Sequence, residues 1–136
     1  MARRSIVLHV EDQDLFHLAV EEGLEDAGVV VDLCRAHDGA TAVQYLLDPS
    51  KSWPDLILLD LIMFPQDGFW FLEEVSTWAP PLRDRLKVAV LTTSADEADQ
   101  LKSASYLVQP VAVFQKPLLF EDLVGILEQL GHFIEE

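Results

Sequence analysis

The chain has 136 residues, which fits one domain, and half of them are hydrophobic, enough to bury a core. Nine Lys and Arg against 24 Asp and Glu give a net charge of −15, which argues against direct binding to nucleic acid or to an anionic membrane surface. A single cysteine excludes an internal disulfide framework and a thiolate zinc cluster, and no apolar run is long enough for a membrane span or a signal peptide. We therefore expect a soluble cytoplasmic protein with one domain, residues 1–136.

Strand-like and helical patterns alternate along the first half of the chain. The elements predicted there are a strand over 5–10, a helix over 14–27 closed by Gly28, a strand over 29–34, a helix opened by Asp38-Gly39 and ended near Pro49, and a strand over 56–59. Leu15, Leu18, Ala19 and Leu24 recur near helical spacing in the first helix. The 56–59 run is apolar on both faces, as in a strand inside a parallel sheet.

The same alternation continues through the second half. The elements predicted there are a helix capped by Asp67-Gly68, a strand over 88–91, a polar helix over 95–105, a strand over 111–114, and a helix over 121–130. Five successive strand–helix units predict an α/β fold, an open and doubly wound five-stranded parallel sheet with helices on both faces.

In such a fold the functional site lies beyond the carboxyl ends of the strands, near the point where the strand order reverses. Four of the five predicted strands end in groups capable of phosphate or metal chemistry. These groups are Glu11-Asp12, Asp60, Thr92 and Lys116.

These strand ends resemble those of the receiver domain of two-component response regulators. The matching segments are Val10-Glu11-Asp12, Leu56 to Asp60, Asp67-Gly68, Leu91 to Ser94, and Phe114 to Pro117. The resemblance covers essentially the whole chain and implies a flavodoxin-like (βα)5 receiver with a short C-terminal extension, residues 131–136, and no output domain. The Leu-Thr-Thr-Ser run looks like that of small stand-alone regulators that partner bacterial phytochromes and similar histidine kinases.

The resemblance implies a role for each strand-end residue. Asp60 would accept a phosphoryl group from a sensor histidine kinase, Lys116 would contact that group, and the Thr92 hydroxyl would turn toward it as the switch. The metal would be Mg²⁺, with Mn²⁺ as the alternative, held by Glu11, Asp12, Asp60 and the main-chain carbonyl of Ile62. Three crowded carboxylates independently favour such a hard cation, because they repel one another without it.

Three departures from the family pattern are visible. Ile62 stands where a polar side chain is common, and the usual proline four residues after the nucleophile is replaced by Phe64, with Pro65 following. Val113 stands where the aromatic switch residue is common, and Phe114 is one residue out of register, so it is expected to face the other side of the sheet.

The sequence supports a signalling switch with weak self-catalysis and not a metabolic enzyme. The alternative is a pseudo-receiver, an interaction module that phosphorylation does not control. An aspartate-nucleophile phosphatase is disfavoured because Ile62 cannot act as its second acid/base, and a flavodoxin because the acidic run after the first strand would repel a phosphate.

An apolar segment suggests self-association. Leu101, Tyr106 to Val108 and Val111 are apolar where a receiver's fourth helix and fifth strand meet solvent, and Phe133-Ile134 adds apolar bulk to the tail. We therefore expect a homodimer through the face of the fourth helix, fifth strand and fifth helix. The cognate kinase and the downstream target are not specified by the sequence.

Overall fold

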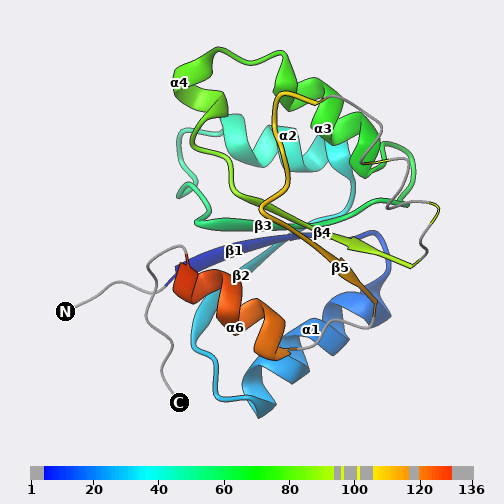
Figure 1. The fold of residues 1–136 in the computed structure, drawn as a ribbon, viewed down its shortest axis with the longest axis vertical. Helices are drawn as coiled ribbons and strands as arrows, with labels where there is room; N and C mark the ends of the chain where they lie inside the picture. Colours follow the sequence, from blue (N-terminus) through cyan, green and yellow to red (C-terminus); the bar gives the residue numbers. More distant parts are fainter. Residues whose placement is uncertain (1–4, 94–95, 97–100, 102–105, 117–119, 130–136) are drawn as a thin grey trace.

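A computed structural model describes residues 5–93, 96, 101, 106–116 and 120–129 (Figure 1). The elements, in chain order, are β1 (Ser5–Val10), α1 (Asp14–Asp26), β2 (Val31–Ala36), α2 (Gly39–Leu47), β3 (Leu56–Asp60), α3 (Gly68–Ser76), α4 (Pro80–Arg83), β4 (Val88–Thr92), β5 (Ala112–Gln115) and α6 (Phe120–Gln129). The predicted helix over 95–105 falls mostly outside the described residues, and the predicted extension over 131–136 falls entirely outside them.

The strands form one parallel sheet in the order β2-β1-β3-β4-β5. Figure 1 shows α2, α3 and α4 on one side of this sheet and α1 and α6 on the other. The predicted doubly wound α/β fold is therefore confirmed. The strand order reverses direction beside β1, so the pairing of β1 with β3 marks the place where such folds build their sites.

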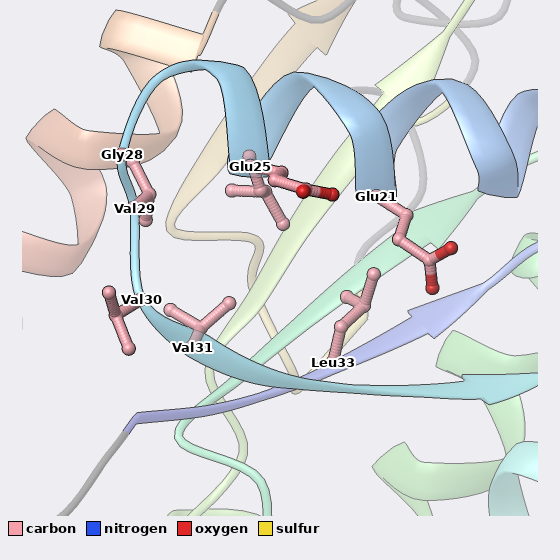
Figure 2. A pocket seen from close by; sticks show the side chains of 8 residues that line it. Glu21, Glu25, Gly28, Val29, Val30, Val31 and Leu33 are labelled. Carbon is pink, nitrogen blue, oxygen red and sulfur yellow. The ribbon is translucent and has the colours of Figure 1, made fainter.

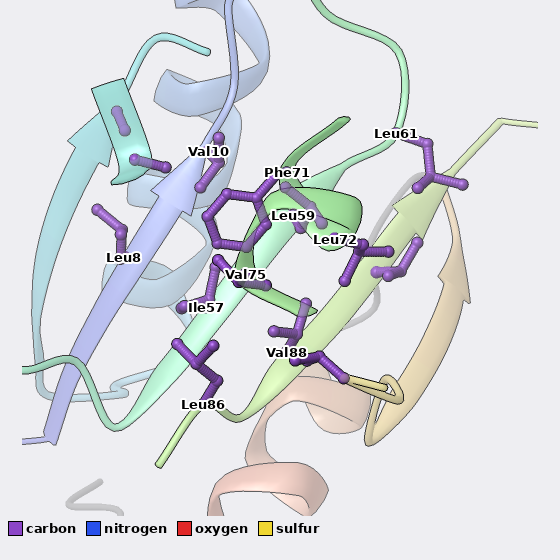
Figure 3. Close-up of a cluster of buried hydrophobic side chains, with 14 of the residues drawn as sticks. Leu8, Val10, Ile57, Leu59, Leu61, Phe71, Leu72, Val75, Leu86 and Val88 are labelled. Atoms are coloured by element: carbon purple, nitrogen blue, oxygen red, sulfur yellow. The ribbon is translucent and has the colours of Figure 1, made fainter. Parts of the chain in front are cut away.

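The alternation of side chains along each strand divides the core into two layers. On β3, Ile57 and Leu59 point toward α2 and α3, where Phe71 and Leu72 of α3 complete the packing shown in Figure 3. Leu58 and its alternate neighbours point to the opposite layer, against α1 and α6. All five residues of β3 are buried, as expected for a strand covered on both faces. Within the described residues, no helix is both long enough and apolar enough to cross a membrane.

The second strand begins two residues later than the sequence predicts. Gly28 has a φ of 71°, the left-handed conformation that favours glycine, and the chain reverses direction there. Val29 belongs to this turn, because its N–H donates to the carbonyl of Leu24 at 2.9 Å while its side chain is buried. Pairing with β1 starts only at Val31, opposite Ser5.

Of the leucines at helical spacing in α1, only Leu24 is buried. Leu15 and Leu18 are 72% and 44% exposed, whereas Val20 and Leu24 are buried. The helix carries two stripes with helical spacing, and the sheet takes the stripe that includes His17. The His17 ring is held inward because its Nδ1 lies 2.9 Å from Nδ1 of the buried His9 on β1.

Two features bring α3 close to the carboxyl end of β3. Asp67 caps the helix, its side chain accepting a hydrogen bond from the N–H of Trp70 at 2.9 Å. A Cβ atom at Gly68 would lie 2.5 Å from the carbonyl oxygen of Asp60, so only glycine permits this approach.

The short helix α4 was not expected from the sequence, although Pro80-Pro81 suits a first helical turn, where a missing N–H removes no helical bond.

Candidate functional site

Strand register brings the predicted carboxylates together. In the parallel pair of β1 and β3, Val10 lies opposite Leu59, so the next residues along the two strands, Glu11 and Asp60, emerge side by side at the same edge. Asp12 follows directly. Carboxylate oxygens of Glu11, Asp12 and Asp60 all lie within 4.8 Å of one another.

Lys116 arrives at this edge from β5, on the far side of β4. Its backbone N–H donates to the carbonyl of Thr92 at 2.8 Å, which fixes the end of β5 against the end of β4. Its Nζ lies 3.1 Å from Oε1 of Glu11 and 3.1 Å from Oδ2 of Asp60. The buried Thr92 ends β4 between them in the sheet order. The structure therefore places Glu11, Asp12, Asp60, Thr92 and Lys116 at one end of the sheet.

The donor set fits a hard divalent cation. Three carboxylates face one ammonium group, which leaves excess negative charge in a largely buried place. Oδ2 of Asp12 accepts a hydrogen bond from the N–H of Phe64 at 3.3 Å, but Oδ1 is buried without a hydrogen-bond partner among the described residues. A buried oxygen of this kind calls for a ligand, and oxygen-only donors are those that Mg²⁺ and Mn²⁺ take.

The acidity of the Glu11 carboxyl is shifted by its surroundings. Burial, together with a hydrogen bond to Asp60 and the charge of Asp60, raises its pKa to about 7, although Lys116 acts in the opposite direction. The metal-free site therefore holds a proton near neutral pH.

This shift predicts a pH dependence of stability. The pKa of Glu11 in the folded state lies above the unfolded value of 4.5, so between these two values folding is coupled to the binding of a proton. The free energy of unfolding therefore decreases as the pH rises from 4.5 to about 7. Glutamine does not titrate, so Glu11→Gln should lack this decrease. In a chelating buffer, we expect its free energy of unfolding minus that of the parent to increase by on the order of 2 kcal/mol across that pH range. Denaturant unfolding at a series of pH values measures the difference.

The comparison with the variant is needed because His9 has the opposite slope. Burial lowers its pKa to about 3, so stability from His9 rises between pH 3 and 6.5. Parallel pH curves for the parent and Glu11→Gln would contradict the assignment to Glu11.

Three contacts of the site were not anticipated from the sequence. Arg35 of β2 donates from Nε to the carbonyl of Glu11 at 3.1 Å and from Nη1 to Asp14 at 2.6 Å, which secures the loop after β1. The ring of Phe16 lies with its centroid 4.5 Å from Nζ of Lys116. The sequence offered one indication of the role of Arg35, namely an arginine within a predicted strand of a strongly acidic chain. The contact of Phe16 with Lys116 could be identified only from the fold.

The structure shows where the residues that depart from the family pattern lie. Ile62 and Phe64 are 54% and 83% exposed in the loop after β3, and the Phe64–Pro65 peptide bond is cis. Val113 pairs with Val90 and Phe114 with Leu91, and Phe114 packs in the layer of α1 and α6 while Val113 is 40% exposed. The expectation that Phe114 faces away from the usual switch position is confirmed.

A separate groove lies elsewhere on the molecule, beside β2. A groove of about 420 Å³ separates the end of α1 from β2 and is lined by Glu21 and Glu25 together with apolar residues such as Val29, Val31 and Leu33 (Figure 2). It contains none of the strand-end residues predicted for the site.

Comparison with known proteins agrees with the geometry. A family model described as the response regulator receiver domain matches residues 7–128. The KDP operon transcriptional regulatory protein KdpE of Escherichia coli strain K12 is 28% identical over 112 residues, which are 79% of this chain and 45% of KdpE. The chain thus spans less than half the length of the curated relatives that it matches.

Several solved structures have the same fold over nearly the full chain. The bacteriophytochrome response regulator AtBRR is 28% identical with a TM-score of 0.79, covering 97% of this chain and 96% of that one. The phosphorylated cyanobacterial phytochrome response regulator RcpA is 29% identical with a TM-score of 0.75, covering 98% and 100%. The Mn²⁺-bound form of the response regulator Rcp1 is 30% identical with a TM-score of 0.69, covering 95% and 93%.

Proposed function

The chain belongs to the response regulator receiver family, and from this premise we propose that Asp60 accepts a phosphoryl group from a sensor histidine kinase. The observation that carries the proposal is the buried Asp60 carboxylate, held between Lys116 and the carboxylates of Glu11 and Asp12. The kinase is proposed to be of the phytochrome type, because three similar solved structures are phytochrome or bacteriophytochrome response regulators.

In the proposed transfer, a carboxylate oxygen of Asp60 attacks the phosphorus of a phosphohistidine. The new O–P bond forms an acyl phosphate as the P–N bond breaks and the imidazole leaves. Lys116, 3.1 Å from Asp60, stabilises negative charge on the transferred oxygens. A divalent cation bound by Glu11, Asp12 and Asp60, with the main-chain carbonyl of Ile62, would neutralise the remaining charge. The Thr92 hydroxyl then donates a hydrogen bond to the acyl phosphate, which links phosphorylation to the conformation at the end of β4.

Incubation with a small phosphodonor and Mg²⁺, followed by intact mass measurement, tests the proposal. We expect the mass of one phosphoryl group to be added, in an acid-stable and base-labile form. An unmodified mass under conditions that label another receiver domain would favour the pseudo-receiver, for which the altered loop from Ile62 to Pro65 is the supporting observation.

The side chain at position 62 should set the lifetime of the acyl phosphate. Ile62 lies two residues after Asp60 and offers no polar group to orient an attacking water, so we propose that it shields the phosphoryl group. We expect Ile62→Asn to shorten the half-life of the phosphorylated protein, with little change in Mg²⁺ affinity. Ile62→Leu, which keeps an apolar side chain, should retain the parent half-life. An unchanged or longer half-life in the Asn variant would refute the shielding role.

The surface proposed for a homodimer is smaller than the sequence suggested. Leu101 and Val108 are buried in the core with α3, so they cannot form an interface, whereas Leu107, Val111 and Val113 are 67%, 41% and 40% exposed around β5. We propose that these three residues form the contact between two copies.

Sedimentation of the full chain at tens of micromolar tests this contact. We expect a dimer whose affinity increases as salt screens the net charge of −15. The Val113→Lys variant should be monomeric. Leu47→Lys, which alters a 56% exposed leucine on α2, is the matched control and should leave the dimer intact. A monomeric parent at about 0.15 M salt would exclude the dimer.

A further inference from the structure

A second hollow lies at the end of the sheet opposite to Asp60. It measures about 260 Å³, and we call it the basic pocket; its lining includes Tyr45, Asp48, Lys51, Trp53, Leu82 and Arg85. These residues come from the end of α2, from the loop that leads into β3, and from α4 and the turn before β4. Since β3 is five residues long, about 16 Å of strand separates the pocket from the phosphorylation site.

Cations are concentrated around this pocket. Of the nine Lys and Arg residues of the chain, Arg35 and Lys116 serve the carboxylate site, and three others lie outside the described residues. The remaining four precede β3 or β4 at this end of the sheet, and they are Lys51, Arg83, Arg85 and Lys87. A chain with a net charge of −15 thus gathers its remaining described cations in one place.

Both cations that line the pocket are placed over aromatic rings. The guanidinium carbon of Arg85 lies 4.4 Å from the centroid of the Trp53 ring, and Nζ of Lys51 lies 5.8 Å from that of Tyr45. A guanidinium stacked on an indole keeps its N–H groups directed outward in its own plane, where a carboxylate can accept two of them.

Hydrogen bonds hold the pocket in this shape. The Tyr45 hydroxyl donates to the carbonyl of Ser52 at 3.1 Å, and the Trp53 Nε1–H donates to the carbonyl of Arg85 at 3.1 Å, which ties the two loops together. Asp48 adds one negative charge to the lining; hydrogen bonds to its Oδ1 from the hydroxyl and the N–H of Ser50 and, to a lesser extent, the charge of Lys51 lower its pKa. Because the loops are ordered beforehand, a ligand would spend little binding energy on arranging them.

We infer that the basic pocket binds an acidic segment of a partner protein, with one carboxylate side chain held between Lys51 and Arg85. The pocket is smaller than the usual small-molecule site of about 300–1,000 Å³, so it suits a side chain better than a nucleotide. Arg83 and Lys87 belong to the same segment as Arg85 but lie outside the lining. Because Asp60 lies at the other end of the sheet, binding here leaves the phosphorylation site accessible and does not depend on the function proposed for it.

Fluorescence anisotropy of a short, labelled peptide of alternating glutamate and alanine tests the inference at about 0.15 M salt, where long-range repulsion is screened. We expect saturable binding that Lys51→Gln and Arg85→Gln each weaken about fivefold or more, since each removes a direct partner of the carboxylate. Arg85→Lys should weaken binding almost as much, because lysine keeps the charge but lacks the planar fork.

The matched controls remove the same charge from outside the lining. Arg83→Gln and Lys87→Gln should each weaken binding less than about twofold. An equal loss of peptide affinity in all four Gln variants would indicate nonspecific attraction to a basic surface and would refute binding in the pocket. Absence of peptide binding, or displacement of the peptide by inorganic phosphate or ATP at concentrations no higher than its own, would overturn the choice of an acidic protein segment.

Discussion

Asp60→Asn should abolish phosphorylation by a small phosphodonor in the presence of Mg²⁺. The amide keeps the size of the side chain but removes the anionic oxygen that would attack phosphorus. It also removes one of two carboxylates that contact Lys116 at 3.1 Å, so the ammonium group would turn fully to Glu11. Intact mass measurement at matched times should show one added phosphoryl group in the parent and none in the variant.

Asp67→Asn is the matched control for this change. Asp67 lies in the same loop region and caps α3 through the N–H of Trp70, a role that asparagine also fills. This variant should be labelled as fully as the parent. Labelling of Asp60→Asn to the same extent as the parent would show that the phosphoryl group resides on another residue.

Saturating Mg²⁺ should stabilise the protein, and Asp12→Ala should remove that response. An ion at 100 times its dissociation constant adds about 2.7 kcal/mol by mass action, if it binds only the folded state. Without metal, removal of Asp12 relieves repulsion with Glu11 and Asp60 and gives up only the 3.3 Å hydrogen bond from Phe64, so the metal-free variant should be no less stable than the parent. Thermal unfolding with Mg²⁺ and with a chelator measures both effects.

A neighbouring aspartate serves as the control for the metal experiment. Asp14 is also close to the end of β1, but it is exposed and pairs with Arg35 at 2.6 Å instead of facing Asp60. Asp14→Ala should keep the full response to Mg²⁺. A melting temperature of the parent that is indifferent to Mg²⁺ would mean that the three carboxylates do not form a metal site.

Several parts of the fold followed directly from local sequence. The run Leu56 to Leu59, apolar on both faces, could only be satisfied inside a sheet covered on both sides, and β3 occupies the predicted place. Asp38 and Asp67 precede their helices and cap them, because a short side-chain acceptor satisfies a free N–H of the first turn. Predictions of this kind succeed where the stabilising partner lies within a few residues.

Other parts depended on contacts that local sequence does not encode. The apolar spacing of α1 fitted two faces, and the one that packs carries Val20 and Leu24 into the core and His17 against His9 of the neighbouring strand β1. Leu101 and Val108 had the composition of an exposed patch, yet each side chain is buried in the apolar cluster that includes Phe71, Leu72 and Val75 of α3. An amphipathic pattern indicates that a face is buried but does not identify what buries it.

The sequence by itself determined which groups stand at the strand ends, since the carboxylates, the hydroxyl and the lysine directly follow apolar runs that form strands. Only the tertiary structure decided how these groups interact. The register of β1 on β3 places Glu11 beside Asp60 and raises its pKa, and Lys116 reaches both carboxylates across β4. Charge interactions of this strength depend on distances of a few ångströms and on burial, and both are set by strand pairing between residues far apart in the chain.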